Sequence, residues 1–139
     1  MNSVRRELLI ICDASPLILL AKGGQLDLLR ALAVEVWIPA AVWREAVINA
    51  VGHPEAAMIA RDFSPLNESP DTELEAAFRL QVDPGEAAIY GEAAALAFAA
   101  RNRHACLLMD DAHGRALAEL NNFRCGARWV GLFGRSKRL

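Results

Sequence analysis

Acidic side chains follow the most apolar stretches of this sequence. Asp13 comes directly after the run from Leu8 to Cys12. Asp110 and Asp111 come directly after the run from Ala105 to Met109. Runs of this kind are typical of strands that are buried on both faces of a parallel sheet. The sequence therefore predicts carboxylates at the carboxyl ends of two central strands, where open α/β sheets place their functional sites.

Two further acids lie near the starts of expected helices. Glu45 belongs to a helix expected over about residues 40–50. Glu86 belongs to the longest expected helix, which the sequence Asp-Pro-Gly-Glu at 83–86 begins with a cap residue and a proline. Because parallel strands end and their following helices begin at one edge of a sheet, these glutamates could meet the aspartates that follow the strands.

The chemistry of such a set is that of a hard divalent cation. Converging carboxylates repel one another, and the pKa of each would rise unless a cation were bound. Oxygen donors suit Mg²⁺ or Mn²⁺. One or two such ions would lower the pKa of an attacking water and stabilise a leaving oxygen. The residue types therefore predict in-line hydrolysis of a phosphodiester.

Each acid taken alone also has a structural interpretation. Glu86 could complete a helix start, and Glu45 could be a solvated surface residue. Asp110 and Asp111 could cap the helix expected after them. Asp13 is the hardest to explain in this way, because a buried strand gives the residue at its end little reason to be acidic.

Strands and helices alternate along the chain, which predicts an α/β fold with a mostly parallel sheet in a single domain over residues 1–139. The expected strands are residues 8–12, 34–38, 105–109 and 128–132, with a short edge strand at 63–66. The expected helices are residues 15–20, 26–32, 40–50, 55–61, one that a capping box at Thr72 and Glu75 opens, 83–102 and 112–121.

Composition narrows the class of protein further. The formal net charge is −2, and five Arg and Lys residues without an acid lie in 124–139. The three cysteines have no spacing typical of a disulfide framework or a zinc site, which favours a reducing, cytoplasmic location. No apolar stretch approaches the ~20 residues of a membrane span, and no signal-peptide pattern begins the chain.

Four ordered motifs give the sequence a resemblance that covers nearly the whole chain. In order, they are residues 12–18, 38–45, 83–89 and 107–111. Together they resemble the motifs of PIN domains, most closely those of the VapC-like, PilT N-terminus branch. The resemblance implies a three-layer α/β/α sandwich and a Mg²⁺- or Mn²⁺-dependent ribonuclease.

The resemblance also implies roles for residues and partners. Asp13, Glu45, Glu86 and Asp110 would form an acidic quartet, with Asp111 as a substitute or an addition. Many relatives are toxins of toxin–antitoxin pairs, form homodimers and are silenced by a small antitoxin. An RNA substrate, a cognate antitoxin and a homodimer are therefore expected partners.

Two departures from the family pattern keep alternatives open. The third acid is Glu rather than the more usual Asp, and the chain stops soon after residues 130–134, where relatives continue into further helices. A C-terminus shortened in this way favours an alternative, a catalytically weak PIN-fold module for binding or dimerisation. A phosphohydrolase with Asp13 as covalent nucleophile is disfavoured, because Ser15 stands where its second acid is expected.

Overall fold

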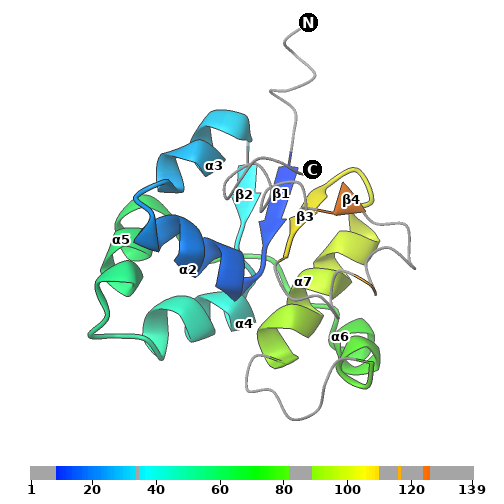
Figure 1. The fold of residues 1–139 in the computed structure, drawn as a ribbon. Coiled ribbons are helices and arrows are strands. Elements are labelled where there is room, and N and C mark those ends of the chain that lie inside the picture. The colour runs from blue at the N-terminus through cyan, green and yellow to red at the C-terminus, as the bar shows by residue number, and fades with distance from the viewer. Residues whose placement is uncertain (1–8, 34, 82–88, 110–115, 117–123, 126–139) are drawn as a thin grey trace, which may run out of the picture.

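The computed structural model describes residues 9–33, 35–81, 89–109, 116 and 124–125. Its elements in chain order are β1 (Leu9–Cys12), α2 (Ala14–Lys22), α3 (Leu26–Leu32), β2 (Glu35–Trp37), α4 (Ala40–Trp43), the π-helical turn η1 (Arg44–Ile48), α5 (Pro54–Asp62), α6 (Thr72–Arg79), α7 (Ile89–Arg101), β3 (Cys106–Leu108) and β4 (Arg124–Cys125). Figure 1 shows the strands at the centre and the helices around them.

The sheet is parallel throughout its described part. Its strand order is β2-β1-β3-β4, and every neighbouring pair runs in the same direction. Ile11 of β1 lies opposite Trp37 of β2 on one side and Leu107 of β3 on the other. The predicted α/β class with a mostly parallel sheet is therefore confirmed.

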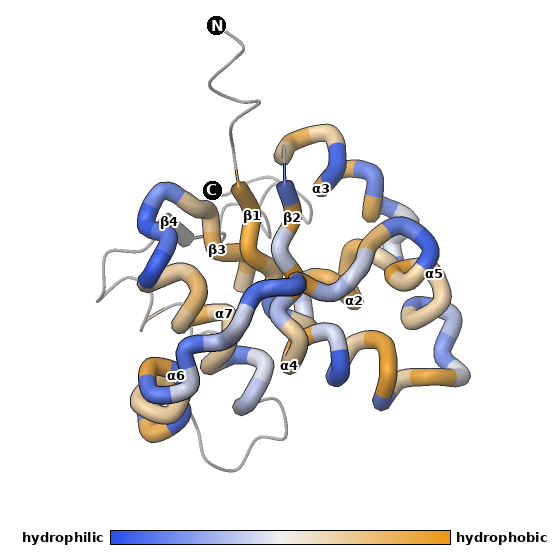
Figure 2. The backbone as a smooth tube through the Cα atoms, turned by 180° about the vertical axis from the view of Figure 1, so that it is seen from behind, coloured by the Kyte–Doolittle hydropathy of each residue, from blue (hydrophilic) through white to orange (hydrophobic). Residues whose placement is uncertain are grey.

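β1 divides the core into two halves. Successive side chains of a strand point to opposite faces of the sheet. Leu9 and Ile11 pack in a cluster with α6 and α7, whereas Ile10 and Cys12 pack in a cluster with α2, α3, α4, η1 and α5. Both faces of the sheet are thus covered by helices, which gives the predicted three-layer α/β/α sandwich. Figure 2 shows β1 as one of the most hydrophobic segments of the molecule.

Small side chains bring α7 close to its neighbours. Its central residues 93–97 are all buried, and four of the five are alanine. α7 contacts α6, α4, β1 and β3, so it is enclosed on several sides. Within the part of the chain that the structure describes, no helix combines the length and hydrophobicity that crossing a bilayer requires.

The helix expected over residues 40–50 is not a regular α-helix. It begins at Ala40 as predicted but changes to the π-helical turn η1 after Trp43. The N–H of Asn49 donates to the carbonyl of Arg44 at 2.8 Å, a bond that spans five residues. Turns of this kind are rare in proteins, and those that do occur are often at functional sites. Glu45 lies in this turn.

The expected edge strand at 63–66 is wrong. The segment is irregular. Its pairing with the end of β2 is limited to one described hydrogen bond, in which Leu66 N–H donates to the Ile38 carbonyl at 2.9 Å. Pro65 has no N–H to extend such pairing. In Figure 2 the largely hydrophilic connection between α5 and α6 crosses the molecule instead, carrying the chain from one face of the sheet to the other.

Several expected elements lie outside the described residues. They are the helix start at 83–86, the helix at 112–121 and the strand at 128–132. β4 is a short strand that the sequence analysis did not anticipate, since two residues carry too little pattern to be recognised.

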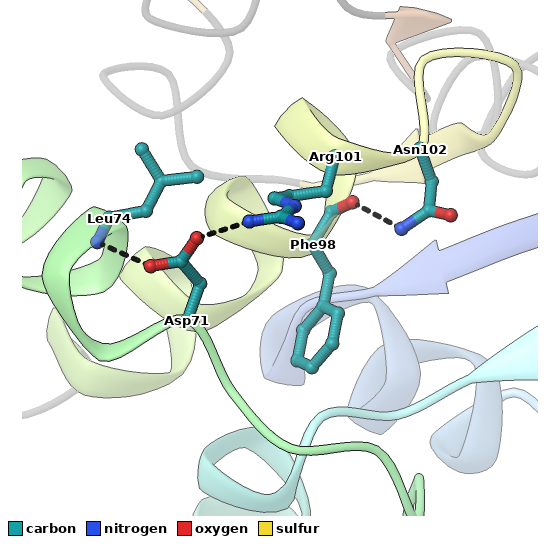
Figure 3. A network of polar contacts seen from close by, with 5 residues as sticks. All are labelled: Asp71, Leu74, Phe98, Arg101 and Asn102. Carbon is teal, nitrogen blue, oxygen red and sulfur yellow. Dashed lines mark hydrogen bonds and ion pairs between the residues drawn. The ribbon is translucent and has the colours of Figure 1, made fainter.

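Asp71, rather than Thr72, caps α6. Its Oδ1 accepts a hydrogen bond from the N–H of Leu74 at 3.0 Å, and its Oδ2 accepts one from Arg101 Nη1 of α7 at 2.6 Å (Figure 3). Beside this pair, Asn102 Nδ2 donates to the Phe98 carbonyl at 2.9 Å. The Leu74 N–H and the Arg101 guanidinium hold the pKa of the Asp71 carboxyl below its usual range. The start of α6 is therefore tied to the end of α7.

Replacing Asp71 tests this connection. We expect Asp71→Ala to lower the melting temperature, because the cap and the ion pair are both lost. Asp71→Asn keeps a cap acceptor and should lose less. Because the folded-state pKa of Asp71 is depressed, its stabilisation is present above the unfolded value of about 3.9 and is lost as the pH falls through the folded value. The melting temperatures of the wild-type protein and Asp71→Ala should therefore differ at neutral pH and approach each other at acidic pH. Equal melting temperatures at neutral pH would contradict the prediction.

Candidate active site

Asp13 lies at the carboxyl end of β1, as predicted. Its N–H donates to the carbonyl of Leu108 at 3.0 Å, so the chain leaves the sheet level with the end of β3. Its Oδ1 accepts a hydrogen bond from the N–H of Ala14 at 2.8 Å, at the start of α2. The residue is only 5% exposed. A carboxylate is therefore buried where the central strand meets its helix.

Helix capping explains only part of this arrangement. Asn or Ser would cap α2 as well as Asp does, without burying a charge. Burying an ionised carboxylate costs free energy unless a partner compensates. Capping therefore does not explain why residue 13 is acidic, and its carboxylate oxygens are donors of the kind that a hard divalent cation prefers.

Glu45 projects from η1 onto the first turn of α7. A Cβ atom placed with ideal geometry on Gly91 would lie 2.8 Å from Glu45 Oε1. The side chain is half-buried, and this burial raises the pKa of the Glu45 carboxyl. Glu45 is therefore partly enclosed beside α7 rather than fully solvated, and its role as a site residue stays a prediction.

Glu92 is a buried acid that the sequence analysis missed. It lies in the first turn of α7, directly after Gly91, and is 5% exposed. Asp13 and Glu92 are the two charged side chains that are buried among the described residues. A signal was present in the sequence, because Gly91-Glu92 repeats Gly85-Glu86 and an alanine-rich, buried run follows it.

The elements that carry these acids surround one edge of the sheet. Figure 1 shows the start of α2, the helix α4 and the start of α7 near the ends of β1 and β3. α2 contacts η1, and α4 contacts α7. Asp13, Glu45 and Glu92 therefore come from three elements around this edge.

The expected metal ligands are only partly within the described residues. Glu86, Asp110 and Asp111 lie outside them. Among the residues that are described, no group of three or more His, Cys, Asp or Glu side chains is close enough to hold a metal ion. The described acids at the edge nevertheless offer carboxylate oxygens, two of them from buried residues, and these donors suit a hard divalent cation in kind.

A family model described as a PIN domain matches residues 9–132, nearly the whole chain. The chain therefore belongs to the PIN domain family. PIN domains are generally nucleases, typically use divalent metal ions and bind RNA. No curated protein and no solved structure matches this chain significantly. Membership of the VapC-like branch stays a prediction.

The half-buried Glu45 gives a prediction about pH. Its folded-state pKa is raised above the unfolded value of about 4.3, so stability is lost as the pH rises through the folded value. Glu45→Gln removes this charge. In EDTA we expect the variant to unfold at higher urea concentration than the wild-type protein at neutral pH, and the advantage to vanish below about pH 4.

Glu68→Gln is the matched control, because Glu68 is exposed in the connection before α6. Its urea midpoint should stay close to that of the wild-type protein at both pH values. A Glu45→Gln variant that is less stable than wild type at neutral pH in EDTA would show that burial of the carboxylate carries no cost.

Proposed function

We propose that this chain is a metal-dependent endoribonuclease that hydrolyses RNA phosphodiester bonds with Mg²⁺ or Mn²⁺. The observation that carries the proposal is the buried carboxylate of Asp13 at the carboxyl end of the central strand. Membership of the PIN domain family supports the same reaction class. Glu45, directed at the start of α7 on the same edge, supplies a second acid.

Several acids are proposed as the site residues: Asp13, Glu45, Glu86 and Asp110, with Asp111 as a substitute or an addition. The third acid has two candidates, Glu86 from the motif at residues 83–89 and Glu92 from the first turn of α7. Glu86 has the motif spacing, whereas Glu92 is supported by its burial and by its position beside the residue that contacts Glu45. Position favours Glu92, because it directly follows Gly91, beside which the carboxylate of Glu45 lies.

The residues of the chain would prepare this chemistry before any ion arrives. The bond from Ala14 N–H fixes the orientation of the Asp13 carboxylate, and the bond from Asp13 N–H to Leu108 fixes its place at the sheet edge. Because the pKa of the Glu45 carboxyl is raised, this carboxyl becomes protonated as the pH falls. A cation that binds to it at low pH would have to displace the proton. When bound, the ion would lower the pKa of an attacking water and stabilise the leaving oxygen.

The biological setting that we propose follows from the resemblance to VapC-like proteins. The chain would act in the cytoplasm as the toxin of a toxin–antitoxin pair, as a single domain that forms a homodimer and is silenced by a cognate antitoxin. These partners are proposals that rest on the four motifs at residues 12–18, 38–45, 83–89 and 107–111.

Cleavage of a mixed RNA pool tests the proposed reaction. We expect the wild-type protein to cleave RNA with Mg²⁺ or Mn²⁺ and not with EDTA. Asp13→Asn should keep the acceptor for Ala14 N–H but lower the cleavage rate by more than about 100-fold. Mutation of a residue that only orients a metal ligand already lowers affinity or activity by about 10–100-fold, and the loss of a ligand should exceed this. Asp71→Asn is the matched control and should keep wild-type activity, since Asp71 belongs to the α6 cap.

Two results would count against this function. An active Asp13→Asn protein would refute the role of the acid. A folded wild-type protein that binds Mn²⁺ but cleaves no RNA would favour the alternative, a catalytically weak module for binding or dimerisation.

Comparison of Glu86→Gln with Glu92→Gln tests the third acid. We expect Glu92→Gln to weaken Mn²⁺ binding and cleavage more than Glu86→Gln, because Glu92 follows the residue beside which the carboxylate of Glu45 lies. Calorimetric titration with Mn²⁺ and cleavage assays would measure both effects. A larger loss for Glu86→Gln than for Glu92→Gln would identify Glu86 as the third acid.

A further inference from the structure

Gly91 of α7 lies beside the carboxylate of Glu45. A Cβ atom on Gly91 would lie 2.8 Å from Glu45 Oε1, nearer than real Cβ atoms come to a neighbour. The next nearest atoms belong to Val42 of α4, with Cγ2 at 3.4 Å and Cα at 3.5 Å, which are ordinary contact distances. A methyl group would therefore fit at Gly91 except for the carboxylate of Glu45.

The backbone gives no reason for glycine at this position. Among the described glycines, Gly24 and Gly52 have positive φ angles and Gly91 does not. Glycine disfavours a helix relative to alanine, and the helix that contains Gly91 is otherwise rich in alanine. The space beside Gly91 is therefore the feature that explains the residue.

From this contact we infer that Gly91 is a positioning residue for Glu45, because its missing side chain leaves the space in which the Glu45 carboxylate is held at the sheet edge that carries Asp13. The inference rests on the proposed function, in which Glu45 is a metal ligand. Gly91 itself touches neither ion nor substrate; it acts through the carboxylate.

The two walls of this space are fixed by packing. Val42 is fully buried in the cluster on one face of the sheet, and Ala93 and Leu96 of α7 are fully buried in the cluster on the other. Close-packed interiors leave such walls little freedom to move. The carboxylate end of Glu45 is the flexible partner, so a methyl group at residue 91 would displace the carboxylate rather than the helices.

Gly91→Ala separates positioning from stability. Alanine favours the helix, so the melting temperature should be unchanged or higher. The displaced carboxylate should weaken Mn²⁺ binding, measured by calorimetric titration, by about tenfold or more, as for residues that orient metal ligands. RNA cleavage should fall in parallel. On a Glu45→Gln background, Gly91→Ala should produce no further loss, because the ligand charge is already absent.

Gly23→Ala is the matched control for the change of residue type. Gly23 ends α2 with a φ of −86°, and the nearest atom to its added Cβ would lie at 3.6 Å. This variant should keep wild-type Mn²⁺ affinity and cleavage.

A second measurement in EDTA tests the contact without any metal. Gly91→Ala should raise the melting temperature more on a Glu45→Ala background than in the wild-type protein, because the carboxylate no longer obstructs the methyl group. Additive effects of the two substitutions in EDTA, or wild-type Mn²⁺ affinity for Gly91→Ala in an active protein, would overturn the inference. A wild-type protein that neither binds Mn²⁺ nor cleaves RNA would instead overturn the proposed function, and the coupling in EDTA would still decide whether Gly91 holds Glu45.

Discussion

Burial of β1 on both faces is the constraint on which the rest of the structure depends. Leu9 and Ile11 supply one half of the core, and Ile10 and Cys12 supply the other, so helices must cover both sides of the sheet. A strand enclosed in this way can place a polar group only at its end. Asp13 takes that place, and its bond to Leu108 sets it beside the end of the neighbouring strand.

The second constraint is the close packing of α7. Its alanine-rich centre is buried against the sheet, α4 and α6, and the pair of Asp71 with Arg101 ties its end to the start of α6. With α7 held at both its centre and its end, the first turn becomes a fixed surface at the sheet edge. Glu92 is enclosed there, and the absence of a side chain at Gly91 admits the carboxylate of Glu45.

Local sequence patterns predicted much of the fold. The runs at 8–12 and 105–109 contain β1 and β3, and the expected helix at 26–32 coincides with α3, because apolar periodicity is a property of neighbouring residues. Prediction failed where the local sequence allowed two structures or two capping residues. Segment 63–66 has a strand-like composition, but with Pro65 it forms one backbone bond instead of a ladder, and Asp71 rather than Thr72 provides the cap of α6.

The sequence by itself determined that acids follow buried strands and that strands alternate with helices, because both features lie in contiguous residues. Only the tertiary structure decided the environment of each acid. Glu45 is half-buried, and its carboxylate lies beside Gly91 in the first turn of α7, which is distant in the sequence. Glu92 is buried in a helix that contacts α4, α6 and the sheet. The cost of burying a charge depends on such distant neighbours, which is why the chemical candidates could be named from the sequence while their surroundings could not.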